Sequence, residues 1–265
     1  MIYNLVFNLL VAHVLGDFYF QSSKMCNDKV INSYKGAALY IHALIIGILS
    51  WAAVWEGNAW WLALGVMTGH FVTDYLKSRL QLRCRVYTIQ GSGTDARMVD
   101  GNNKRYDIRF FLLDQIVHVG VIVLLAYVWF YEYKGNWRQF GWVDSLVETH
   151  PMRLKMAIAL LLALKPANTV ILLIMGACKV NVVTNSGGDH GNFHSGSLIG
   201  WMERGLILIF VVLAQYEAIG FLIAAKSILR FNETTSENEK SEYVLTGTLL
   251  SLAIALLLGL AVLRF

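Results

Sequence analysis

The stretch KGAALYIHALIIGILSWAAVWE, residues 35–56, decides the fold. It is apolar almost throughout, and a hydrocarbon core about 30 Å thick requires roughly 20 such residues in a helix. One histidine, His42, lies inside it, where an ionisable side chain is costly unless it faces protein or a cavity. The stretch therefore predicts a membrane-spanning helix that carries a polar group into the protein interior.

The rest of the chain contains further stretches of this kind. Its 265 residues are 56% hydrophobic and 15% charged, with a formal net charge of +4 and a mean hydropathy of +0.51, whereas soluble proteins average roughly 25% charged residues. These values predict an all-α, polytopic membrane protein with about seven transmembrane helices, at residues 2–21, 35–56, 58–77, 107–131, 152–178, 200–225 and 243–263. The fifth contains Lys165 and Pro166, and proline kinks or ends a helix, so residues 167–182 alternatively lie along the membrane surface.

The loops predict the orientation of the chain. Lysine and arginine concentrate in residues 22–35 and 77–109, which fall on one side if the first four spans alternate. Because basic loops are retained in the cytoplasm, we expect the N-terminus outside and the C-terminus inside. The loop at 78–106 contains the alternating segment RCRVYTIQ followed by turn residues, which predicts a small hairpin. We divide the chain into residues 1–131, with four spans, and residues 132–265, with about three.

Seven ionisable side chains lie within the first four predicted spans. Six of them form three pairs in which histidine and aspartate are four residues apart, so that both members lie on one face of a helix. Counted from the loop ends, all seven reach a similar depth of roughly 10 Å at 1.5 Å per residue. We expect one site formed by His13, Asp17, His42, His70, Asp74, Asp114 and His118.

Histidine and aspartate together indicate metal binding. We expect one or two divalent ions, Zn or Mn, at these seven residues. A bound ion would activate water for hydrolysis, with Asp17, Asp74 or Asp114 as catalytic base. Gln21 and Gln115, beside the motifs, are expected to orient the ligands.

The predicted function is thus hydrolysis of a lipid-like or membrane-delivered substrate. Two alternatives stay open: a proton- or metal-coupled transporter, and a structural cluster that joins helices. The chain contains no nucleotide-binding loop and no serine-nucleophile motif, and its three cysteines have no zinc-finger spacing. Membrane lipids, not nucleic acid, are the expected partners.

The first half also contains an internal repeat. Residues 12–24, AHVLGDFYFQSSK, align with residues 69–81, GHFVTDYLKSRLQ, and each segment precedes a span that carries a histidine. This pattern predicts a parallel repeat of helical hairpins, related by a pseudo-two-fold axis along the membrane normal.

The second half offers weaker candidates for anion binding or for support of the site. Two lie in the KPAN segment, two in the sixth predicted span and one directly after that span: Lys165, Asn168, Arg204, Glu217 and Lys226. If the sixth span is one helix, Arg204, Gln215 and Lys226 share a face and Glu203 lies near Glu217 on a second. These groups would neutralise the aspartates, bind a phosphate or join helices.

Several motifs together resemble a known family. They are AHVLGDFYFQ (12–21), GHFVTDYLK (69–77), FLLDQIVH (111–118), KPAN (165–168), WMERGLILIFVVLAQYEAIGFLIAAKSILRF (201–231) and YVLTGTLLS (243–251). With them the chain resembles the bacterial membrane proteins of domain-of-unknown-function family 3307, which implies a multi-pass protein of the bacterial inner membrane and no particular activity. The H-x-x-x-D signature alone is similar to that of bacterial membrane-bound metal-dependent hydrolases.

Overall fold

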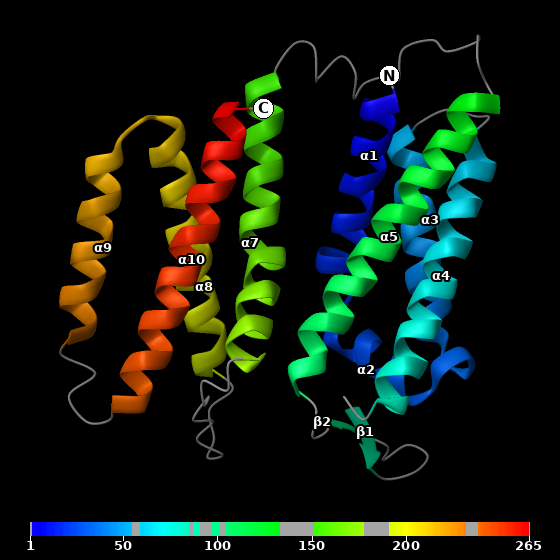
Figure 1. Ribbon diagram of the computed structural model, residues 1–265, viewed down its shortest axis with the longest axis horizontal. Helices are drawn as coiled ribbons and strands as arrows, with labels where there is room; N and C mark the ends of the chain where they lie inside the picture. Colours follow the sequence, from blue (N-terminus) through cyan, green and yellow to red (C-terminus); the bar gives the residue numbers. More distant parts are fainter. Residues whose placement is uncertain are drawn as a thin grey trace. The chain divides into compact units, whose positions relative to one another are not determined.

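A computed structural model describes residues 2–54, 59–84, 87–90, 97–100, 104–132, 151–177, 191–231 and 238–264. The chain forms two compact units, Met1–Pro151 and Met152–Phe265. Each unit consists of long helices packed side by side (Figure 1).

The first unit contains two helical hairpins. Its elements are α1 (Ile2–Val14), the π-helical turn η1 (Leu15–Phe20), α2 (Ser23–Ile31), the short 3₁₀ turn η2 (Ser33–Lys35), α3 (Ala37–Val54), α4 (Trp60–Arg83), β1 (Tyr87–Gln90), β2 (Arg97–Asp100) and α5 (Lys104–Glu132). Helices α1 and α4 run in one direction, and α3 and α5 run in the other (Figure 1). Strands β1 and β2 pair antiparallel, which confirms the hairpin predicted within residues 78–106.

The second unit is an up-and-down arrangement of four helices among its described residues. They are α7 (Pro151–Ala177), α8 (Gly191–Val212), α9 (Tyr216–Phe231) and α10 (Asn238–Arg264). Helix α7 begins with proline, which is favourable at the first helical position because its missing N–H is not needed there.

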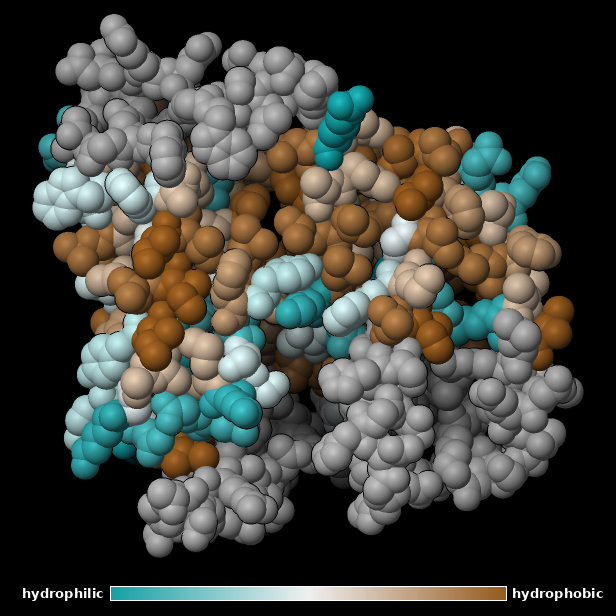
Figure 2. Space-filling view, turned by 180° about the vertical axis from the view of Figure 1, so that it is seen from behind, coloured by the Kyte–Doolittle hydropathy of each residue, from teal (hydrophilic) through white to brown (hydrophobic). Residues whose placement is uncertain are grey.

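Five of the described helices are long and apolar enough to cross a membrane: Ile2–Phe20, Ala37–Val54, Ile108–Glu132, Met152–Gly176 and Leu245–Arg264. Their outward faces are apolar; on α3, for example, Ile41, Leu44 and Ile48 are each at least half exposed. Figure 2 shows hydrophobic residues over much of the described helical surface on the face that it draws. A soluble monomer rarely exposes so much apolar surface. The described part of the chain is therefore all-α apart from its small hairpin, and its apolar helices are those expected of a membrane protein.

The predicted count of seven spans is not confirmed. Residues 58–77 fall largely in helix α4, which is not among the five apolar helices, because His70, Asp74 and Lys77 lower its mean hydropathy. The sixth predicted span, residues 200–225, is wrong as a single helix. It is divided between α8 and α9 by a turn in which Ala214 has φ 55° and the Gln215 amide donates to the Phe210 carbonyl at 2.8 Å.

The fifth predicted stretch, residues 152–178, forms the continuous helix α7, so the alternative in which the helix is interrupted at Lys165 and Pro166 is wrong. A proline has no N–H to donate to the carbonyl four residues earlier, here that of Leu162, and side chains of neighbouring helices support membrane helices at such positions. The polar contact made here is with the next two carbonyls. Buried Arg204 of α8 donates to the carbonyls of Ala163 at 2.5 Å and Leu164 at 3.2 Å. It also donates to Ser251 Oγ of α10 at 3.1 Å, so this arginine joins three helices beside the proline.

The core of the first unit is arranged in layers. Buried residues recur at four-residue spacing, with Leu62, Val66, His70 and Asp74 on α4 and Asp114, His118, Ile122 and Ala126 on α5. Residues four apart lie one above the other on a helix face. Each helix therefore contributes an apolar layer and an adjoining polar layer.

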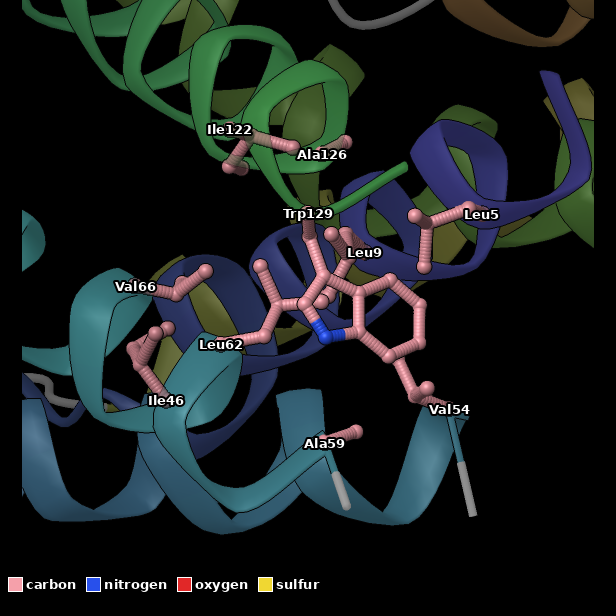
Figure 3. Close-up of a cluster of buried hydrophobic side chains, with 10 residues drawn as sticks. All are labelled: Leu5, Leu9, Ile46, Val54, Ala59, Leu62, Val66, Ile122, Ala126 and Trp129. Carbon is pink, nitrogen blue, oxygen red and sulfur yellow. The ribbon is translucent and has the colours of Figure 1, made fainter. Parts of the chain in front are cut away.

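The apolar layer is centred on Trp129 of α5. Its indole ring lies among Leu9, Val54 and Leu62 from three other helices (Figure 3). Trp129 is 1% exposed and Leu62 is fully buried, so this layer closes one side of the polar layer with tightly packed hydrophobic groups.

Substitution of Gly259 tests the close packing of α8 and α10. A Cβ atom there would lie 2.7 Å from Val211 Cγ1 and 2.8 Å from Val211 Cβ, and valine is restricted to one main rotamer in a helix. We expect Gly259→Ala to lower the free energy of unfolding by about 1–3 kcal/mol. The matched control, Gly220→Ala, has no atom within 4 Å of the added Cβ and should be neutral or stabilising. Thermal denaturation in detergent measures both, and equal losses of stability would contradict the packing.

Candidate metal centre

Asp17 lies in the π-helical turn that continues α1. Such turns are rare and occur frequently at functional sites. Gly16 lets this turn approach α3, because a Cβ at residue 16 would lie 2.1 Å from Ile46 Cδ1. The turn places Asp17 Oδ2 3.8 Å from His13 Nε2, so both side chains face the interior of the unit.

Four potential ligand atoms converge between η1, α3 and α4. His42 Nε2 lies 2.9 Å from His70 Nε2 and 3.2 Å from Asp17 Oδ1, and His70 Nε2 lies 3.3 Å from the same oxygen. Both nitrogens lie 3.6 Å from Asp74 Oδ2. Ligands placed about 2.0–2.1 Å from a tetrahedral ion are separated by about 3.3 Å. The five separations lie near this value, and three of the atoms, from His42, His70 and Asp74, form a group that could hold a metal ion.

The remaining predicted ligands adjoin this set. The His118 ring lies 4.1 Å from the His70 ring and 5.0 Å from the His13 ring, centroid to centroid. Three overlapping groups could each hold an ion: His13 with Asp17 and His70, His42 with His70 and Asp74, and Asp74 with Asp114 and His118. The structure therefore brings all seven residues predicted from the sequence into one cluster, while their role as ligands stays a prediction.

The hydrogen bonds of His118 leave one ring nitrogen available. Its Nδ1 donates to the Asp114 carbonyl at 2.8 Å, because a carbonyl can only accept. The proton is then on Nδ1, and the lone pair of the neutral ring is on Nε2. This Nε2 is buried without a hydrogen-bond partner, as are both ring nitrogens of His13. Metal-binding histidines commonly have this arrangement, with the second nitrogen bonded to a carbonyl.

Two lysines also belong to the cluster. Their positions in the sequence predict only basic loop residues. Lys29, on α2, is 5% exposed and forms an ion pair with Asp74. Lys77, one turn after Asp74 on α4, donates to Asp114 Oδ2 at 2.7 Å. The cluster is therefore partly neutralised by ammonium groups.

A sequence signal existed for only one of these lysines. Lys77 is three residues after Asp74 and seven after His70, so all three share one face of α4. Lys29 lies on α2, within residues 22–35, a segment that the sequence predicts only as a basic loop. Its contact depends on how α2 packs under the bundle, and no spacing rule predicts that.

The two predicted supporting glutamines both lie at the cluster. Gln115 Nε2 is 3.3 Å from Asp114 Oδ2 and 3.5 Å from Asp17 Oδ2. With its amide oriented to suit its neighbours, Gln21 donates to the Asp17 carbonyl at 3.2 Å and accepts from Lys29 at 2.6 Å. Gln115 therefore connects Asp114 to Asp17, and Gln21 connects Asp17 to Lys29.

The candidates in the second half belong to the second unit. Lys165 and Asn168 lie within the continuous helix α7, and Glu217 is exposed in the first turn of α9. Lys226 donates to Glu203 at 2.5 Å across α8 and α9. The prediction that Arg204, Gln215 and Lys226 share a helix face is wrong because the helix ends before Gln215. Arg204 and Lys226 instead join helices.

Residues 5–147 match the family described as a protein of unknown function, DUF3307. The match covers more than half of the chain, and the chain belongs to this family. All seven residues of the His/Asp cluster lie within it, whereas the motifs quoted from residues 165–251 lie outside it. No match was found among curated proteins or solved structures, and the similarity to membrane-bound hydrolases stays a prediction.

Removal of Lys29 tests the electrostatics of the cluster. Lys29→Met leaves the carboxylate of Asp74 buried without this counter-ion, so we expect the metal-free protein to lose about 3–5 kcal/mol of stability. Lys29→Met/Asp74→Asn removes both charges and should recover part of the loss. Denaturation of both variants in detergent, with metal chelated, measures the difference. If the double variant is no more stable than the single one, the ion pair does not determine stability here.

Proposed function

We propose that this member of the DUF3307 family is a metal-dependent hydrolase in a membrane, acting on a lipid-like or membrane-delivered substrate. The convergence of two histidine nitrogens and two carboxylate oxygens from η1, α3 and α4 carries the proposal. Five distances among these atoms lie between 2.9 and 3.6 Å. Two imidazoles and two carboxylates suit Zn or Mn.

The residues around this set have separable roles. A divalent ion would lower the pKa of water and thereby supply hydroxide near neutral pH. Asp17 and Asp74 contribute to the ligand set, which leaves Asp114 as the general base. Its Oδ2 accepts from Lys77, while its Oδ1 is buried without a hydrogen-bond partner. Asp114 is therefore held in place with one oxygen available for a proton.

The layering of the core supports access from one side. Beyond the polar layer the core consists of apolar residues around Trp129. On the opposite side lie α2 and the end of α4, where hydrophilic residues gather in Figure 2. We place this end at the cytoplasmic surface, where polar lipid headgroups lie. A substrate in the membrane would reach the site from there.

Metal content is the first test. We expect tag-free, detergent-purified protein to retain about one equivalent of Zn or Mn, measured by plasma mass spectrometry. Asp17→Asn and His42→Ala each remove one ligand and should lose this metal, while Glu217→Gln, an exposed carboxylate of the second unit, should keep it. Circular dichroism checks that the variants stay folded. If protein never exposed to chelator holds no metal after incubation with Zn²⁺ and Mn²⁺, the proposal is wrong.

A metal- or proton-coupled transporter is the second candidate. It is favoured by the two lysine–aspartate pairs, because buried ionisable pairs in membranes often mark ion pathways. In such a protein, Lys29 and Lys77 would exchange places with the transported cation at Asp74 and Asp114.

Reconstitution into vesicles separates the two functions. For the hydrolase we expect no flux of Zn²⁺ or protons in proteoliposomes, because the apolar layer blocks one side of the site. We expect turnover of a lipid extract that is lost in Asp114→Asn. Flux that is driven by a metal or pH gradient and abolished by Asp74→Asn would instead establish the transporter.

A further inference from the structure

The two lysines of the cluster pair with aspartates that are themselves candidate metal ligands. Lys29 and Lys77 contact Asp74 and Asp114, and these two aspartates belong with His118 to one group of closely spaced ligand atoms. The two ammonium groups therefore approach the same part of the cluster from different helices, α2 and α4.

The charge of the cluster favours an anionic ligand. Three carboxylates and two ammonium groups leave one negative charge when the histidines are neutral. One divalent ion would change the net charge of the cluster from −1 to +1, and a second divalent ion would raise it to +3. A buried positive charge is unfavourable unless an anion accompanies it. The balance thus favours a single ion together with an anionic substrate.

The ammonium groups also have donors to offer. An ammonium group has three N–H donors, and among the described residues Lys77 donates to Asp114 alone. The side chain of Lys77 is 28% exposed, whereas that of Asp114 is 2% exposed. The ammonium group of Lys77 is therefore partly exposed while it contacts the buried cluster.

We propose that Lys29 and Lys77 bind the oxygens of a phosphate ester, which is the substrate class of this site. The inference rests on the proposed function. A phosphate group presents several charged oxygens and can contact two ammonium groups and a metal at once, whereas a neutral ester or amide presents one carbonyl oxygen. The oxygen of a water molecule would bond to phosphorus while the phosphorus–oxygen bond to the alcohol breaks. One proton of that water would pass to the departing alcohol oxygen, so the products are the free alcohol and phosphate.

Coupling between metal and phosphate tests this inference. The full chain in detergent is titrated with Zn²⁺ against a chelator, with and without inorganic phosphate. We expect phosphate to tighten Zn²⁺ binding by about 5- to 150-fold, the usual range of coupling between two ligands. Lys77→Met and Lys29→Met should bind Zn²⁺ with little or no enhancement by phosphate, and Lys29→Arg should keep the enhancement. Lys24→Met, an exposed lysine of the same helix α2, should match the wild type.

The outcomes separate the two proposals. Failure of the wild type to bind Zn²⁺ and, in the same titration, Mn²⁺ overturns the hydrolase itself. Zn²⁺ binding that phosphate does not change, or changes equally in Lys77→Met, overturns the phosphate site alone. Glycerol phosphate and phosphatidic acid in micelles then identify the source of the ester, because release of phosphate from either one supports the inference.

Discussion

The buried charges of the first unit must neutralise one another, and its helix arrangement depends on this constraint. An unpaired buried charge costs several kcal/mol. The pair of Lys29 with Asp74 holds α2 against α4, and the pair of Lys77 with Asp114 joins α4 to α5. His42 connects α3 to Asp17 in the π-helical turn. The same contacts that hold these helices together also assemble the candidate ligands.

Close packing beside the polar layer fixes the positions of these candidate metal ligands. Gly69 precedes His70, and a Cβ there would lie 2.6 Å from Val121 Cγ1 of α5. The small residue lets α4 and α5 approach, as small residues do between membrane helices. The Trp129 layer then holds the same helices from the apolar side. Ligand positions set by helices packed in this way are more precise than those set by loops.

Sequence reasoning predicted the cluster better than the helices that surround it. The four-residue spacing of His70 with Asp74 and of Asp114 with His118 depends only on helix geometry, and the similar depth of the spans brought these pairs to one level. The turn at Ala214 was not predicted, and the sequence left open whether α7 continues through Pro166. Both depend on tertiary contacts, such as the bonds from Arg204 to the carbonyls beside the proline, which local pattern does not encode.

The two aligned repeats differ at the candidate site. His13 and Asp17 correspond to His70 and Asp74, but Phe20 stands at the position that corresponds to Lys77. The first hairpin supplies its lysine from α2 instead, and this lysine pairs with Asp74 of the second hairpin. The first repeat also has a π-helical turn where the second has a regular helix. In the register that aligns His42 with His118, Asp114 corresponds to Ala38 of the first hairpin, so its carboxylate has no counterpart there. Asp17 and Asp74, in contrast, correspond to each other. This asymmetry agrees with the proposal that Asp114 acts as base while Asp17 and Asp74 hold an ion.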